Sequence, residues 1–287
     1  MLKSPVKNRY EIEPEDIKFN IYDYVELVVD TNGITTSDII KVLPQFNELL
    51  PQEKYQREDS SLTMDEINDY ADRQDNPISM FARKRYMEDM VIRYITEDAR
   101  EVVSISRLFT SIYLAYDVAH TLKDSFKQIG KIIDILNTLD YFVVRKIYLI
   151  KSDSIYCTSL ENLYNCFDKE MFADTAYKVL QKDKNLNVDT GTVQICNSFT
   201  IDGIDIFLKK TIMAGNQPDS TDIIYRGELK TIISSGGSEN KMNIEDCFHI
   251  LNRKSFEMFM YHITDNFAQD LITGNSKYVM RGMNQYA

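Results

Sequence analysis

The sequence Val103-Ser104-Ile105-Ser106 lies within the pattern that decides the fold of this 287-residue chain. Apolar and polar side chains alternate there, as part of a longer stretch, Met90–Ala115. A second stretch of this kind spans Gly191–Ile212. A period of two residues is typical of strands with one buried face and one partly wet face. We therefore expect a strand-rich body built around these two stretches.

Each alternating stretch leads, within its half of the chain, towards a long amphipathic helix. The first helix is expected over Asp117–Leu139 and the second over Ile244–Thr273, because apolar residues recur there at steps of three and four. Asp117 and Asn243 have side chains suited to capping the starts of these helices. Two such repeats predict an α+β fold of two related halves, with mainly antiparallel sheets each covered by a long amphipathic helix.

Turn signals and apolar runs predict the remaining elements. Asp202-Gly203 predicts a hairpin between strands at Gly191–Thr200 and Ile204–Ile212. A short helix is expected from about Ser37, and Gly274 suits the end of the last helix. Further strands are expected over Phe19–Val29, Asp89–Ile95, Glu101–Ala115, Tyr141–Ile150 and Asp222–Ile233.

The predicted domain organisation has four segments: an N-terminal arm at 1–18, a first half at 19–172, a second half at 173–274 and a C-terminal tail at 275–287. The arm is expected to be extended, because Pro5 and Pro14 oppose a helix. Residues 52–76 are polar and acidic, and they predict an exposed excursion that carries a weak helix over Met64–Ala71. This excursion is either a partner-binding loop or a solvated insertion.

The composition is that of a globular protein with an acidic surface. Hydrophobic residues make up 44% and charged residues 27% of the chain, and the formal net charge is −11. Phosphate backbones repel a net negative protein, so direct nucleic-acid binding is not expected. Such binding would require the main basic residues to gather on one face: Arg83, Lys84, Arg85, Lys209, Lys210, Arg253 and Lys254.

Three further features of the sequence indicate where in the cell the protein is expected. No apolar run approaches the ~18 residues that span a bilayer, so no membrane partner is expected. The first seven residues lack the apolar core of a signal peptide, so export by that route is not expected. The four cysteines are scattered and form no CxxC pair, so no disulfide framework is expected; in a reducing cytoplasm they would be small buried or half-buried residues: Cys157, Cys166, Cys196 and Cys247.

The search for chemical motifs predicts no catalytic residue, no cofactor and no metal site. The chain has no GxGxxG and no GxxxxGK[ST] loop. Cys247 and His249 would point about 200° apart on a helix, so they cannot share a metal ion from one face. His262 lies too far along the same helix to join His249.

Several residues resemble a sporadically distributed family of uncharacterised bacterial and phage proteins. The resemblance rests on Val103-Ser104-Ile105-Ser106, Tyr116, the run Phe142-Val143-Val144-Arg145-Lys146-Ile147, and Leu251 followed by Ile263-Thr264-Asp265. It implies a strand–helix–strand core with a closing helix. The chain departs from the family in the run Arg145–Lys151, where a glycine and a terminal asparagine are missing. The resemblance implies no catalytic residue.

These features favour a non-enzymatic structural or protein-interaction subunit that forms homo- or hetero-oligomers. The resemblance to phage proteins suggests a virion component at a capsid–tail connection or in a tail, so the expected location is the cytoplasm or the phage particle. The semi-apolar tail is the predicted partner-binding segment, through Tyr278, Val279, Met280, Met283 and Tyr286. The alternative is a ligand-binding regulator or enzyme with a cleft between the two halves.

Overall fold

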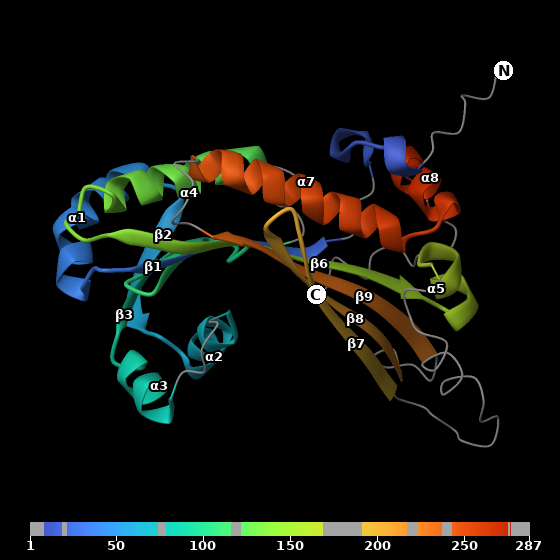
Figure 1. Ribbon diagram of the computed structural model, residues 1–287, viewed down its shortest axis with the longest axis horizontal. Coiled ribbons are helices and arrows are strands. Elements are labelled where there is room, and N and C mark those ends of the chain that lie inside the picture. Colours follow the sequence, from blue (N-terminus) through green and yellow to red (C-terminus); the bar gives the residue numbers. More distant parts are fainter. Residues whose placement is uncertain are drawn as a thin grey trace. The chain divides into compact units, whose positions relative to one another are not determined.

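The computed structural model describes residues 9–18, 22–73, 79–115, 122–168, 191–216, 223–236, 243–274 and 276. Within these residues, nine strands form one large sheet in the order β2-β3-β4-β5-β1-β6-β9-β8-β7 (Figure 1). Strands β2 to β5 pair antiparallel in sequence order, and so do β7 and β8. The protein therefore has a mixed α and β fold with a large antiparallel sheet, which agrees with the expected fold class at that level.

The strands are β1 (Tyr22–Asn32), β2 (Tyr55–Ser61), β3 (Met90–Thr96), β4 (Glu101–Ser106), β5 (Phe109–Ala115), β6 (Val143–Cys157), β7 (Gly191–Ile201), β8 (Ile204–Asn216) and β9 (Ile223–Gly236). The helices are α1 (Thr36–Leu49), α2 (Met64–Arg73), α3 (Met80–Tyr86), α4 (Leu122–Leu136), α5 (Leu160–Cys166), α7 (Ile244–His262) and α8 (Asp265–Thr273). None of the described helices combines the length and apolar character needed to cross a membrane.

The chain forms two compact units. Unit 1 comprises Met1–Val25, Ile150–Ile233 and Leu251–Ala287. Unit 2 comprises Glu26–Leu149 and Ser234–Ile250. Each unit therefore combines segments that are distant in the sequence, and neither coincides with the continuous ranges 19–172 or 173–274.

Unit 2 contains the β2–β5 meander with helices on both sides. Helices α1 and α4 lie on one side of these strands, and α2 and α3 lie on the other (Figure 1). Each of α1 and α4 has a face of buried apolar residues, which includes Phe46 on α1 and Phe126 on α4. The Phe126 ring stacks on Phe248 at a centroid distance of 5.6 Å. Full burial of side chains of this size contributes about 1.5–3 kcal/mol each, which explains why the amphipathic helices pack here.

Unit 1 contains a long hairpin formed by β7 and β8. The two strands pair in register from Gly191↔Ala214 to Ile201↔Ile204. The loop residues Asp202 and Gly203 have φ values of 54° and 78°. Positive φ at both central positions defines a type I′ turn, the turn whose twist matches paired strands. The hairpin predicted at Asp202-Gly203 is therefore confirmed.

Two predicted elements are continuous in the sequence pattern but broken in the structure. The strand predicted over Glu101–Ala115 is interrupted after Ser106, because the Ser106 hydroxyl accepts hydrogen bonds from the backbone N–H groups of Leu108 and Phe109. The helix predicted over Ile244–Thr273 is interrupted at Thr264, which has extended backbone angles and caps α8 by accepting a bond from Phe267 N–H. Local side-chain hydrogen bonds thus compete with regular structure at both breaks.

The polar segment 52–76 differs most from its expectation. The part of it that the structure describes is regular structure, strand β2 followed by helix α2. The weak helix predicted over Met64–Ala71 is confirmed, and the segment is exposed along β2 after Tyr55 as expected, but residues 55–61 form a strand rather than a loop. All residues of β2 after Tyr55 are exposed, so the strand has no apolar alternation by which a sequence pattern could reveal it.

The N-terminal segment is also more structured than an extended arm. Its described part, residues 9–18, contains two short 3₁₀ turns at Arg9–Glu11 and Pro14–Asp16. Ile12 is buried, and Lys18 N–H donates to the Leu271 carbonyl at 2.9 Å. The two prolines do oppose an α-helix, but Pro14 is compatible with the first position of a 3₁₀ turn.

Candidate functional site

The two ends of the described sheet, β2 and β7, differ in charge. Strand β2 has the sequence Tyr-Gln-Arg-Glu-Asp-Ser-Ser, and its charged side chains are exposed. Arg57 and Asp59 form an ion pair at 2.7 Å on this strand. Charges on an edge strand hinder pairing with another chain. Strand β2 is therefore a protected edge.

Strand β7 has no such protection. It has eleven residues, Gly191–Ile201, and none of them carries a formal charge. The chain as a whole is 27% charged, so an uncharged strand of this length at the end of a sheet is unusual for this protein. Its even-numbered residues, from Thr192 to Thr200, are exposed, and Phe199 is also 37% exposed. A long uncharged edge with unpaired backbone groups is a template for another strand.

The hairpin geometry determines which backbone groups face outwards. In the type I′ turn, the Ile201 carbonyl and the Ile204 N–H bond to each other, so Ile201 and Ile204 form a hydrogen-bonded pair. Hydrogen-bonded and non-hydrogen-bonded pairs alternate along an antiparallel ladder. The odd-numbered residues of β7 therefore bond to β8. The even-numbered residues direct their N–H and C=O groups away from β8, towards the side of β7 on which no other described strand lies.

The neighbouring strand β8 packs buried apolar residues beside β7. Ile206, Leu208 and Ile212 are buried and lie opposite odd-numbered residues of β7. Lys210 lies opposite Ile195, and partial burial lowers the pKa of its ammonium group. The apolar face of β8 thus continues onto β7, where Ile195 and Ile201 are only half-buried.

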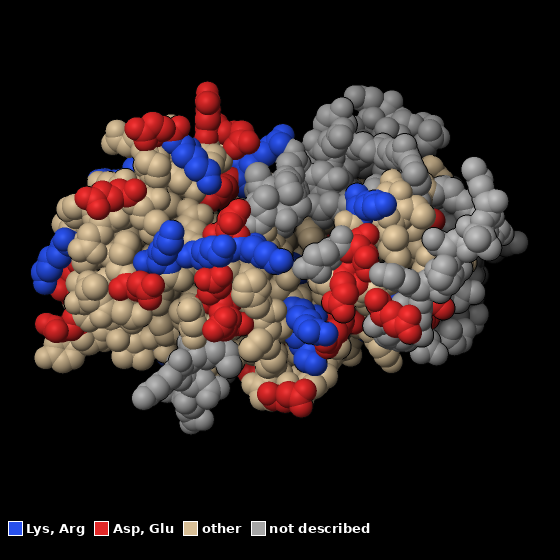
Figure 2. Space-filling model, turned by 90° about the horizontal axis from the view of Figure 1, so that it is seen from above, with Lys and Arg blue, Asp and Glu red and all other residues tan. Residues whose placement is uncertain are grey.

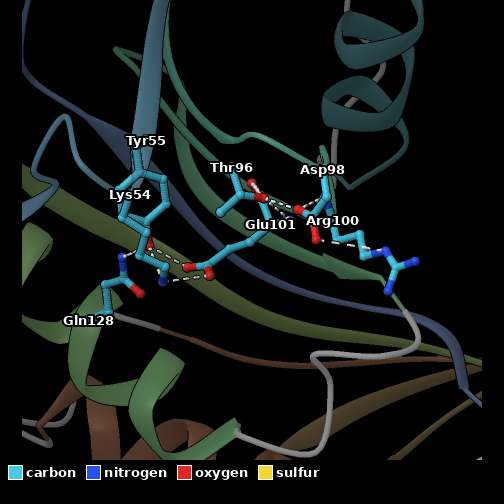
Figure 3. A network of polar contacts seen from close by, with 7 residues as sticks. All are labelled: Lys54, Tyr55, Thr96, Asp98, Arg100, Glu101 and Gln128. Atoms are coloured by element: carbon cyan, nitrogen blue, oxygen red, sulfur yellow. Dashed lines mark hydrogen bonds and ion pairs between the residues drawn. The ribbon is translucent and has the colours of Figure 1, made fainter.

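A second feature is a pocket of about 880 Å³ beside β2 in unit 2, lined in part by Lys54 and Tyr55. The Glu101 carboxylate accepts hydrogen bonds from Lys54 Nζ at 2.8 Å and from the Tyr55 hydroxyl at 2.6 Å (Figure 3). Gln128 on α4 donates to the same hydroxyl at 2.8 Å. Burial and the bond to Glu101 both raise the pKa of Tyr55. These groups satisfy one another, so the network anchors the start of β2 to β4 and α4.

The adjoining turn closes the β3–β4 hairpin with its own polar contacts (Figure 3). Thr96 Oγ1 donates to the Asp98 carboxylate at 2.7 Å, and Arg100 N–H donates to it at 3.2 Å. Ala99 has a φ of 56° in this turn. These bonds shape the turn, and the exposed side chains of Asp98 and Arg100 form an ion pair at 3.8 Å.

A third feature is a buried ionisable pair on β6. Lys151 and Asp153 are 2% and 1% exposed. Both carboxylate oxygens of Asp153 lack a hydrogen-bond partner among the described residues, whereas Lys151 Nζ donates to the Tyr22 hydroxyl at 3.3 Å. Burial raises the pKa of Asp153 to about 7 and lowers the pKa of Lys151 to about 8. The charge state of this buried pair affects the stability of the fold.

The basic residues considered for nucleic-acid binding lie on three elements. Arg83, Lys84 and Arg85 are on α3, and Lys209 and Lys210 are neighbours on β8, so their side chains point to opposite faces. Arg253 and Lys254 on α7 both approach Glu257. On the face shown in Figure 2, basic and acidic side chains of the described residues are interspersed. This arrangement does not favour a phosphate-binding surface.

The other predicted site residues are placed as follows. The partner-binding tail residues, Tyr278, Val279, Met280, Met283 and Tyr286, lie outside the described residues. His249 approaches Glu245 at 3.8 Å, and His262 Nδ1 lies 2.7 Å from the Met258 carbonyl. Within the described part of the chain, no group of three or more potential ligands could hold a metal ion.

The sequence pattern indicates the strand β7 but not its position at the end of the described sheet. The available signal was the absence of any charged residue over Gly191–Ile201. In the comparisons with known proteins, no family model and no curated sequence matches this chain.

Proposed function

We propose that this protein is a non-enzymatic interaction subunit that assembles by strand pairing at the β7 edge. The observation that carries the proposal is the uncharged, eleven-residue strand at one end of the described sheet. Its outward N–H and C=O groups supply main-chain hydrogen bonds, and its exposed side chains supply contacts to a partner strand. The contrast with the charged strand β2 supports association at one end of the sheet only.

The proposal includes the pseudo-duplicated architecture of two related halves. Its support is the order of elements: three strands, β3–β5, precede α4, and three strands, β7–β9, precede α7. In the sheet order, β1 neighbours β5 and β6 neighbours β9, so each set of three strands ends beside an earlier strand. A duplicated body with two differently charged ends suits a subunit that has one directional interface.

We further propose a virion setting for this subunit, at a capsid–tail connection or in a tail. The sequence resemblance to bacterial and phage proteins supports this setting. The proposed location is accordingly the cytoplasm before assembly and the phage particle afterwards. The proposed partners are protein subunits, with the tail residues 278–286 as a further contact segment.

The proposal is tested by the mass of the native protein in solution. Sedimentation velocity should give a mass above 33.4 kDa for the wild type. Gln194→Lys combined with Ser198→Lys places two like charges on exposed positions of β7 and should return the mass to that of one chain. The matched control, Gln56→Lys with Ser61→Lys on β2, changes the same residue types and should keep the wild-type mass.

Two outcomes contradict the proposal. One is a wild type that sediments as a single chain at every concentration. The other is an assembly that survives the β7 substitutions but not those on β2. Circular dichroism of each variant separates a lost interface from a lost fold.

The second candidate function is ligand binding, favoured by the 880 Å³ pocket in unit 2. Pockets of about 300–1,000 Å³ are of the size that small molecules occupy. Native mass spectrometry tests this candidate. A small molecule retained by the wild type and lost in Lys54→Ala/Gln56→Ala would support it, whereas identical masses without added ligand would oppose it.

A further inference from the structure

We propose that the partner at the β7 edge is a second copy of this chain, paired antiparallel about a two-fold axis at Cys196. This inference rests on the proposed function and names the partner and the register. Cys196 is the midpoint of the strand Gly191–Ile201. A full-length antiparallel pair of two copies therefore places each Cys196 opposite the Cys196 of the other copy.

The backbone geometry is compatible with this register. Residues that face the open edge are even-numbered, as established by the type I′ turn and the β7–β8 pairing. In a pair centred on Cys196, even residues meet even residues: Thr192 lies opposite Thr200, and Gln194 lies opposite Ser198. Every outward N–H and C=O group then meets its counterpart in a hydrogen-bonded position. The register that uses the whole strand is thus one that its outward backbone groups, which pair with no other described strand, can satisfy.

The side chains are also self-complementary in this register. Thr–Thr pairs and pairs of small polar residues are favourable across antiparallel strands, and like charges are unfavourable. Strand β7 contributes no charge, so the contact contains no like-charge pair between the two β7 strands, although each chain carries a net charge of −11. Phe199, which is 37% exposed in the single chain, gains a covering strand.

The nearest charges on the neighbouring strand do not oppose the pairing. Asp205, Lys209 and Lys210 lie on β8. The two β8 strands of such a dimer would be three strand spacings apart, about 14 Å. That separation exceeds the Debye length of about 8 Å at physiological ionic strength.

A two-fold pair also explains why association would stop at two copies. Both β7 edges are consumed in an isologous contact, and the remaining ends are the charged β2 strands. A parallel stack of β7 strands would bring the same residues of each copy side by side. The two arrangements therefore predict different residue contacts.

Disulfide trapping tests the register. Cα atoms in a hydrogen-bonded antiparallel pair are about 5.5 Å apart, which is within the range of a disulfide. Cys196 is exposed, whereas Cys157, Cys166 and Cys247 are buried. Mild oxidation of the wild type with copper phenanthroline should give a covalent species of twice the 33.4 kDa chain mass, and Cys196→Ser should abolish it.

Moved cysteines distinguish the antiparallel pair from other arrangements. In a Cys196→Ser background, Gln194→Cys with Ser198→Cys should restore the covalent dimer, because these positions face each other. Thr192→Cys in the same background is the matched control. It should give at least a tenfold lower yield, because the two copies of residue 192 are separated by about 26 Å along the strands.

Each outcome bears on the proposal. Trapping at residue 192 as efficient as at 196 indicates a parallel pair and overturns the two-fold register, while leaving assembly at β7 intact. Assemblies of more than two chains that Gln194→Lys/Ser198→Lys disrupts would likewise overturn the two-fold register and leave assembly at β7 intact. A wild type that neither associates nor forms the Cys196 disulfide overturns both the register and the proposed function.

Discussion

At the residue scale, Lys151 and Asp153 show how position in the sheet determines the cost of a charge. Both lie in β6, whose residues 147–155 are all buried. Removing an ionised group from water is expensive, so burial favours the neutral form of each residue. A structure retains such a pair when its two members compensate each other. Loss of one partner is then far more costly than loss of both.

The pH dependence of stability follows from these shifts. Because the pKa of Asp153 is raised from 3.8 to about 7, the native state holds a proton that the unfolded chain has lost, and stability falls as pH rises between these values. Because the pKa of Lys151 is lowered from 10.5 to about 8, stability rises again as pH increases from 8 to 10.5. The pair contributes least stability between about pH 7 and 8.

Urea unfolding at pH 5, 7.5 and 9.5 checks this prediction. Asp153→Leu alone should cost about 3–5 kcal/mol, because it leaves Lys151 buried beside an apolar group. Lys151→Met combined with Asp153→Leu should be neutral or stabilising by about 1–4 kcal/mol at pH 7.5 and should flatten the pH profile. A single variant as stable as the double variant would show that the two residues do not compensate each other.

At the element scale, helix α7 ends before α8 at a position that the helical periodicity of the sequence does not reveal. Thr264 accepts a hydrogen bond from Phe267 N–H and donates one to the Asn165 carbonyl. Ile263 forms a bridge with Phe167, and Thr264 N–H donates to the Cys166 carbonyl. The sequence contains the capping residue, but the tertiary contacts with the end of α5 make capping preferable to a continuous helix.

Thr264→Ala should therefore destabilise the protein by about 1–2 kcal/mol, because it removes the N-cap of α8 and the hydrogen bond from the Thr264 hydroxyl to the Asn165 carbonyl. Thr264→Ser should recover most of this loss. Thr273→Ala, an exposed position in the last turn of the same helix, serves as the control and should change stability by less than about 0.5 kcal/mol. Equal losses for Thr264→Ala and Thr273→Ala in urea unfolding would contradict the capping role.

Other elements were predictable because their signals are local. The Asp202-Gly203 hairpin depends on two adjacent residues with positive φ, and helix α1 begins with a capping box formed by Thr35 and Asp38. Strand β2 was not predictable, because its exposed residues show no apolar period and only its pairing with β3 makes it a strand.

At the scale of the whole molecule, the proposed pairing depends on the difference in charge between the two ends of the described sheet. One end carries charges and the other carries none. If pairing at β7 involves only folded chains, mass action couples assembly to folding. Thermal stability should then depend on protein concentration.

Calorimetry over a hundredfold range of concentration checks this consequence. The Tm of the wild type should rise by about 1 °C for each tenfold increase. The Gln194→Lys/Ser198→Lys variant should unfold at a Tm that does not depend on concentration, and the Gln56→Lys/Ser61→Lys control should behave as the wild type. A concentration-independent Tm in all three proteins would argue against β7 pairing at these concentrations.

The sequence alone determined the local features of this protein: the tight hairpin, the amphipathic helices and the uncharged run Gly191–Ile201. These depend on neighbouring residues, whose spacing and conformational preferences can be read directly. Only the tertiary structure decided that β6 is interior to the sheet, that Lys151 and Asp153 are buried, and that β7 is an edge. Strand order is set by contacts between distant segments, and no local period encodes which strand lies at the end of the described sheet.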